Sequence, residues 1–145
     1  MTTRNVRALL LDAFEDERSA EATYAAVIQK FGPVRPFINI IEAEGRHAAA
    51  LERQLQRLGF EVPMNRRVEG VAAPPTLEAA CEEAIAAELE SIALYERLIP
   101  QIGDATVRHV LENLQAASRD NHLPAFRRCL ARAGAEGCGS GRRGG

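Results

Sequence analysis

The chain has 145 residues, of which 46% are hydrophobic and 26% are charged, and its formal net charge is -2. A chain of this length and composition is expected to fold as one domain with a buried core. The slightly negative charge argues against a nucleic-acid-binding protein, which usually carries a basic patch. No apolar run approaches the roughly 18 residues that span a bilayer, and the N-terminal stretch lacks a signal-peptide pattern, so no membrane partner is expected.

Alanine occupies 25 of the 145 positions, whereas aromatic residues make up only 5%. Alanine favours helices and strands need β-branched and aromatic residues, so the composition predicts an all-α protein. The first helix is expected from about Thr3 to Phe31, where Gly32-Pro33 ends it. The second helix is expected from near Pro36 to Gly59, and a loop over residues 61–75 follows.

The second half of the chain repeats this organisation. A third helix is expected from about Thr76 to Ile99, and a fourth from the N-cap Asp104 to near Gly134. The Gly-rich tail, residues 135–145, is expected to be disordered. Short connections within each pair of helices and a longer crossover between the pairs predict an antiparallel four-helix bundle over residues 1–134, made of two helical hairpins.

Three cysteines, Cys81, Cys129 and Cys138, lie far apart and include no CxxC pair. This pattern predicts neither a disulfide framework nor a zinc ribbon. Cys81 and Cys129 are interpreted as small buried apolar residues, and Cys138 as an exposed residue of the tail that could contact a metal weakly. We therefore expect a cytoplasmic, reducing compartment.

Each predicted helix places metal-capable side chains in the middle of its apolar stripe, with large apolar residues three or four positions away. Burial of a carboxylate without a partner costs several kcal/mol, so positive charge must lie among these side chains. A pair of metal ions bound by carboxylate oxygen and imidazole nitrogen is the simplest source. The candidate metal ligands are Glu17, Glu21, Glu44, His47, Glu88 and His122.

An internal repeat relates the two predicted hairpins. In the first helix Glu17 precedes Tyr24 by two helical turns, and in the third Glu88 precedes Tyr95 by the same spacing. Each returning helix then carries one of the candidate histidines. The repeat predicts a pseudo-twofold bundle with a shared site on its axis. The two tyrosines are expected to be core residues whose hydroxyls can hydrogen-bond ligand carboxylates.

The pattern Glu17…Tyr24, Glu44-Gly-Arg-His47 and Glu88…Tyr95 resembles the Glu-plus-ExxH arrangement of rubrerythrin-like di-iron proteins in the ferritin-like superfamily. The resemblance covers residues 8–130. The strings DERSAEATYAAVIQKFGPVRPFINIIEAEGRHAAAL and NLQAASRDNHLPAFRR look like a branch of bacterial and archaeal ferritin-like domains of unknown function. The resemblance implies a ferritin-like bundle, iron as the cofactor and a homodimer.

The resemblance also implies a role for most candidate ligands. Glu17 would be the terminal carboxylate of the first helix and Glu88 the carboxylate of the third. Glu44 would be the bridging carboxylate, and His47 the imidazole ligand beside it. Manganese or zinc could replace iron in such a donor set.

The fourth helix departs from the family pattern, because it lacks the second ExxH. When the second and fourth helices are aligned, Ser118 stands opposite Glu44 and Asn121 opposite His47, with His122 one position later. A bridging carboxylate is therefore missing. The sequence leaves open whether the site holds two irons asymmetrically, holds one metal ion or is a remnant.

Two further residues bear on this departure. Glu21 lies one turn after Glu17 and could supply the missing oxygen, although it could also pair with an arginine at the edge of the bundle. Pro124 removes a helical hydrogen bond and is expected to kink the fourth helix just beyond His122.

Each candidate also has a structural explanation without metal. Arg119 could neutralise Glu17 or Glu88 in a buried ion pair. The carboxylate and imidazole of the second helix could form a pair on a solvated flank. His122 could be a core histidine that donates to a glutamate.

Two classes of function follow. A redox enzyme would use the metal pair to react with oxygen or peroxide or to oxidise ferrous iron, as the resemblance implies. Its electrons would have to come from an electron-donor protein or from iron itself, because three cysteines cannot form a rubredoxin-type four-cysteine site. The alternative is a non-catalytic helical scaffold, or a metal-storage or stress accessory with a degenerate site. The missing carboxylate of the fourth helix favours the alternative, whereas the inward polar side chains on all four helices favour the enzyme.

Overall fold

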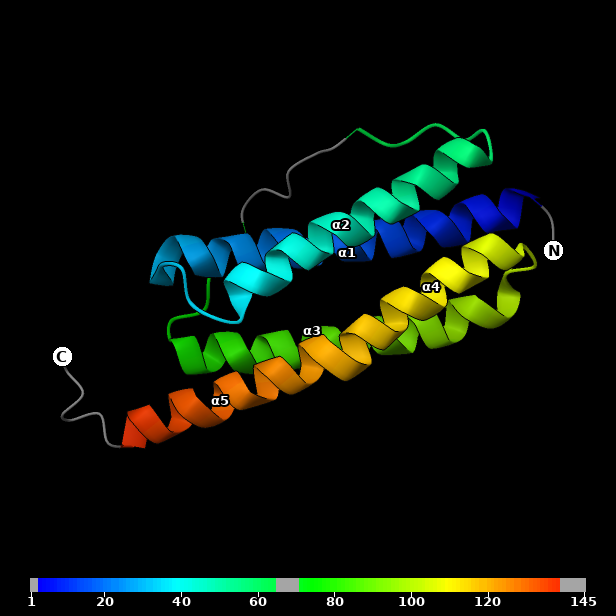
Figure 1. Ribbon diagram of the computed structural model, residues 1–145. Helices are drawn as coiled ribbons and strands as arrows, with labels where there is room; N and C mark the ends of the chain where they lie inside the picture. Colours follow the sequence, from blue (N-terminus) through cyan, green and yellow to red (C-terminus); the bar gives the residue numbers. More distant parts are fainter. Residues whose placement is uncertain (1–2, 65–70, 139–145) are drawn as a thin grey trace.

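The computed structural model describes residues 3–64 and 71–138, and this part of the chain is entirely helical apart from its connections (Figure 1). The helices are α1 (Thr3–Phe31), α2 (Phe37–Arg57), α3 (Leu77–Leu98), α4 (Ala105–Ala117) and α5 (Leu123–Cys138). A 3-10 turn, Ile99–Gln101, follows α3, and a π-turn, Ser118–His122, joins α4 to α5. Because α4, the π-turn and α5 form one continuous helix, the predicted all-α four-helix bundle is confirmed.

The bundle consists of two hairpins. α1 packs along α2, and α3 packs along the α4–α5 helix (Figure 1). The connection between α2 and α3 joins the two hairpins, and residues 65–70 within it lie outside the described residues. This arrangement brings α1 and α3 side by side, so residues from all four helices can meet in the middle of the bundle.

Local signals in the sequence set the helix ends. Gly32 adopts a φ of 89°, a left-handed conformation that favours glycine, directly after α1. The Thr76 hydroxyl accepts a hydrogen bond from the Ala79 amide at 3.0 Å and caps α3. The Asp104 carboxylate accepts one from the Val107 amide at 2.9 Å, as predicted for the N-cap of α4.

The end of the last helix differs from the prediction. α5 continues to Cys138, beyond the expected end near Gly134. Residues 139–145, the rest of the expected tail, lie outside the described residues.

The core has two apolar clusters, with the candidate ligands between them along the bundle. One cluster includes Leu10, Phe14, Leu51, Leu55 and Leu111. The other includes Tyr24, Val27, Phe37, Phe126 and the cysteines Cys81 and Cys129. None of the described helices is both long and apolar enough to cross a membrane.

A disulfide links α3 to α5. Cys81 and Cys129 are buried as expected, but their sulfurs are bonded to each other, so the expectation of two unpaired cysteines is wrong. The two residues are 48 positions apart, and they meet only because α3 and α5 are neighbours. The cysteines therefore do not support the expectation of a reducing compartment.

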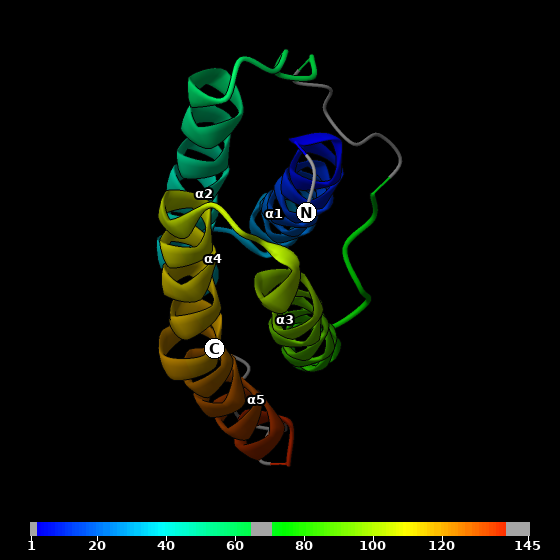
Figure 2. The same ribbon diagram turned by 90° about the vertical axis from the view of Figure 1, so that its right-hand side faces the viewer.

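The π-turn lies where a kink was expected. The Leu123 amide donates to the Ser118 carbonyl oxygen, so this turn holds one residue more than a regular α-helical turn. Pro124 follows directly and cannot donate a backbone hydrogen bond. The helix changes direction between α4 and α5 (Figure 2).

Candidate metal centre

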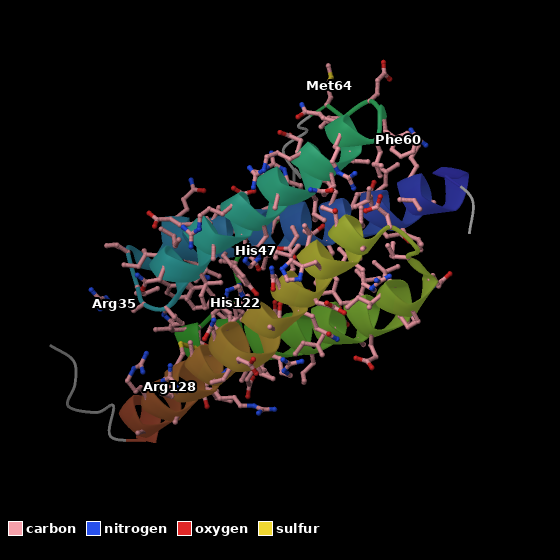
Figure 3. The ribbon with its side chains drawn as sticks, turned by 45° about the vertical axis from the view of Figure 1, so that its right-hand side comes forward. Arg35, His47, Phe60, Met64, His122 and Arg128 are labelled. Carbon is pink, nitrogen blue, oxygen red and sulfur yellow. A yellow bond between two sulfur atoms is a disulfide. The ribbon has the colours of Figure 1, made fainter. Side chains whose placement is uncertain are left out.

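Five of the six candidate ligands converge in the middle of the bundle. Glu17, Glu44 and His47 form one group, in which one ligand atom of each residue lies within 4.8 Å of the others. Glu44, Glu88 and His122 form a second group by the same criterion. Glu44 belongs to both groups, and the two histidines come from α2 and from the π-turn near the middle of the bundle (Figure 3).

These side chains are almost completely removed from solvent. The exposed fractions are 2% for Glu17, 3% for Glu44, 1% for Glu88 and 4% for His122, while the His47 side chain retains 15%. Three carboxylates at this depth would be strongly unfavourable without compensation.

In the first group the imidazole contacts both carboxylates. His47 Nδ1 lies 3.3 Å from Glu17 Oε1 and 3.3 Å from Glu44 Oε1. A single nitrogen between two carboxylate oxygens, all from buried or half-buried residues, is the donor chemistry of an iron, manganese or zinc site.

The second group leaves polar atoms without partners. His122 Nδ1 lies 3.5 Å from Glu88 Oε1, and neither atom has a hydrogen-bond partner although both are buried. Buried polar atoms are nearly always paired, and an orphaned pair indicates a missing ion or water. The two atoms are of the types that bind metal ions.

Two tyrosine hydroxyls hydrogen-bond the Oε2 atoms of Glu17 and Glu88. The Tyr24 hydroxyl donates to Glu88 Oε2 at 2.8 Å, and the Tyr95 hydroxyl donates to Glu17 Oε2. Each tyrosine therefore bonds the glutamate of the other hairpin, a pairing that the repeat in the sequence did not specify. These bonds orient the carboxylates and leave their Oε1 atoms toward the histidines.

The two imidazole rings stack on each other. Their centroids lie 5.6 Å apart and their planes differ by 16°. This pairing across the two hairpins brings the two groups of ligands to the same level of the bundle.

The pKa values of Glu44 and Glu17 shift in opposite directions. Burial raises the pKa of Glu44 far above its usual range, and a hydrogen bond to the charged Glu17 raises it further. Burial would raise the pKa of Glu17 too, but hydrogen bonds from His47, Glu44 and Tyr95 outweigh it and lower that pKa. The raised pKa of Glu44 and the lowered pKa of Glu17 indicate that Glu44 holds the proton of this pair at neutral pH.

Asp16 is a further carboxyl that the sequence analysis missed. It accepts a hydrogen bond from the Ser91 hydroxyl at 2.6 Å, between α1 and α3. Burial raises its pKa to about 6, and the charges of Glu17 and Glu88 add to this effect. Its position directly before Glu17 is the signal in the sequence, but Asp16 lies off the apolar stripe that predicts the candidate ligands.

The sixth candidate lies apart from the other five. Glu21 forms an ion pair with Arg18 at 2.8 Å and belongs to neither group. A methyl group on Gly45 would lie 3.3 Å from Glu21 Oε2, so this glycine makes room for the Glu21 side chain. The structure therefore does not group Glu21 with the other five candidates.

Arg119 does not neutralise the buried acids. Its side chain is 54% exposed and pairs with the neighbouring Asp120 at 3.0 Å. None of the arginine or lysine ion pairs within residues 3–64 and 71–138 includes Glu17, Glu44 or Glu88. The alternative of a buried ion pair with Arg119 is therefore wrong.

The π-turn explains the one-residue offset in the fourth helix. A regular helix would place Asn121 opposite His47, but Asn121 is exposed whereas Ser118 and His122 are both buried. The wider turn accommodates the additional residue and directs His122 inward. The histidine of the second hairpin thus takes a place equivalent to that of His47.

The fold has a counterpart among solved structures. The chain is similar to a hypothetical protein, MJ0754 from Methanococcus jannaschii DSM 2661, with a TM-score of 0.82 and 25% sequence identity. The match covers 92% of this chain and 84% of that chain. No protein-family model matches the chain, and no curated protein matches it.

Proposed function

We propose that the chain is a ferritin-like metal-binding protein whose bundle holds two metal ions that share Glu44. Glu17 and His47 would complete the ligands of one ion, and Glu88 and His122 those of the other. The observation that carries the proposal is the convergence of three buried carboxylates and two imidazoles in overlapping groups. The orphaned atoms Glu88 Oε1 and His122 Nδ1 support it, because a metal ion would satisfy both.

Iron is the metal that we propose first. Carboxylate-rich sites stabilise its higher oxidation state and leave ligand positions for dioxygen or peroxide, and manganese or zinc suit the same donors. The chain's own residues would bind and orient the ions and exclude water. Tyr24 and Tyr95 would fix the carboxylates, and Glu44 would release its proton when an ion binds.

The proposed activity is the oxidation of bound ferrous iron by oxygen or peroxide. Repeated turnover would require electrons from a partner protein or from ferrous iron itself as substrate. A homodimer would be the assembly that the ferritin-like resemblance implies.

The second candidate is a non-catalytic bundle. The observation that favours it is Ser118, which stands where a bridging carboxylate would complete the site. In that case the shared proton between Glu44 and Glu17 is the permanent state of the core.

The two candidates differ in metal content and in reaction with oxidant. Metal-free protein, obtained by chelation, would be loaded anaerobically with ferrous iron in acetate buffer and analysed for iron per chain. Glu44→Gln tests the shared ligand, and Glu42→Gln on the exposed side of α2 is the matched control. We expect the wild type and Glu42→Gln to bind two irons per chain and to develop near-ultraviolet charge-transfer absorption in air. Iron binding without this absorption would favour a metal-storage protein. The absence of bound iron in both the wild type and Glu42→Gln would contradict the proposal.

A further inference from the structure

The two groups that share Glu44 differ in the ligands that their helices supply. α2 contributes both a carboxylate and an imidazole, whereas the π-turn contributes the imidazole of His122 alone. The unpartnered atoms of the site, Glu88 Oε1 and His122 Nδ1, both lie in this second group. The second group is therefore the incomplete half of the site.

Ser118 is the residue that makes it incomplete. It corresponds to Glu44 in the alignment of the two hairpins, and it is 3% exposed. It begins the π-turn that ends at His122, so both residues lie on the buried side of one helical turn. A serine side chain ends two bonds short of the position at which a glutamate places its carboxylate oxygens, and it carries no charge.

The charge of the loaded site requires another anion. Three ionised glutamates against two divalent ions leave one positive charge, and oxidation of the metal increases it. An unbalanced charge in a buried site is costly. Neither Asp16, which accepts from Ser91, nor Glu21, which pairs with Arg18, belongs to the two groups of ligand atoms.

We propose that a small oxyanion from solution, a free carboxylate or an inorganic phosphate, takes the ligand place beside Ser118 that a glutamate would fill. The inference rests on the proposed metal centre and concerns its completion. The oxyanion would supply the missing ligand of the second ion and balance the remaining positive charge of the site. It would bind only when metal is present. Occupancy of the second half of the site therefore depends on the oxyanion concentration, whereas the first half fills without it.

The test is a manganese titration of metal-free protein followed by electron paramagnetic resonance. This method counts free and bound Mn(II) and detects spin coupling between two ions that share a ligand. The titration is run in chloride buffer, and again with acetate or with inorganic phosphate. We expect the second Mn(II) to bind about tenfold more tightly, or better, at an oxyanion concentration about ten times its dissociation constant. The first should change little, and whichever anion gives the shift identifies the source.

Two variants separate the role of Ser118 from general salt effects. Ser118→Glu supplies a carboxylate from the protein, so both ions should bind in chloride and acetate should have no effect. Ser118→Ala removes the hydroxyl without supplying a carboxylate and should retain the acetate dependence of the wild type. The wild-type titration alone decides the matter if Ser118→Glu does not fold.

The outcomes distinguish this inference from the proposed function. Two tightly bound ions in chloride, unaffected by acetate or phosphate, would overturn the inference and leave the metal centre intact. A single bound ion under all conditions would overturn the inference and would also contradict the two-ion centre of the proposed function. No bound manganese or iron at all would contradict the proposed function, and the inference would fall with it.

Discussion

Glu44 is the residue on which the two halves of the site meet. In the metal-free protein burial holds it as a neutral acid, and its proton is donated toward Glu17. A metal ion must displace this proton, so metal affinity should rise with pH. The same proton makes the stability of the metal-free bundle depend on pH.

Metal-free protein should become less stable as the pH rises from about 5 to about 8. The pKa of Glu44 is raised in the folded state, so its contribution is complete below the pKa of the unfolded carboxyl and is lost as the pH rises. One proton corresponds to at most about 1.4 kcal/mol per pH unit. Asp16, with its pKa raised to about 6, adds to the slope at the acidic end.

Urea unfolding in the presence of a chelator measures this slope. Glu44→Gln keeps a hydrogen-bond donor toward Glu17 but cannot ionise, so its slope should be smaller than that of the wild type by about one proton. Equal slopes in the two proteins would show that Glu44 is ionised in the metal-free core.

The two tyrosines should act on different halves of the site. Tyr24→Phe removes the donor to Glu88, and Tyr95→Phe removes the donor to Glu17. Loss of such a bond typically weakens metal binding by about tenfold to a hundredfold. A manganese titration should show weakening of the second ion in Tyr24→Phe and of the first in Tyr95→Phe. The assignment of the halves fails if both variants weaken the same ion.

At the scale of helices, the sequence predicted most of what the structure contains. The apolar stripes, the caps at Thr76 and Asp104 and the glycine after α1 are local signals, and the helices that they imply are present. The π-turn was not predicted, because propensities treat the fourth helix as regular. The indication in the sequence was the position of His122, which lies one residue later than the alignment with His47 requires. A π-turn accommodates one additional residue.

Deletion of Asn121 tests this explanation of the π-turn. The deletion should convert the turn into regular α-helix and leave His122 and α5 in place, with a stability change within about 1 kcal/mol. Deletion of Glu112, an exposed residue in the regular part of α4, should instead rotate the buried residues Leu114, Gln115 and Ser118 out of register and cost more stability than the deletion of Asn121. Thermal unfolding followed by circular dichroism compares the two. If both deletions unfold the bundle, the π-turn is not an absorbed insertion.

At the scale of the whole molecule, residues distant in sequence become neighbours. The convergence of the five ligands could be anticipated because each lies on an apolar stripe near the middle of its helix. The disulfide and Asp16 could not, since they depend on which faces of α1, α3 and α5 meet. A position on an apolar stripe does not by itself predict a ligand, because Glu21 also lies on the stripe of α1 and pairs with Arg18 instead.

The disulfide should contribute substantially to the stability of the second hairpin. Closure of a chain segment of 48 residues corresponds to about 4 kcal/mol in the chain-entropy estimate. A reductant should therefore lower the denaturant midpoint of the wild type. The double variant Cys81→Ala, Cys129→Ala should start near that lower midpoint and not respond to reductant. One free thiol, that of Cys138, is expected in the untreated wild-type protein, and three free thiols, counted by mass spectrometry after alkylation, would contradict the pairing.

The central claim is that two metal ions lie between the hairpins and share Glu44. Anomalous diffraction from crystals of the iron-loaded protein, prepared in acetate, locates such ions directly. We predict two peaks per chain, both at coordination distance from Glu44, one beside Glu17 and His47 and the other beside Glu88 and His122. The absence of peaks at this level of the bundle, or peaks only at surface carboxylates, would contradict the account.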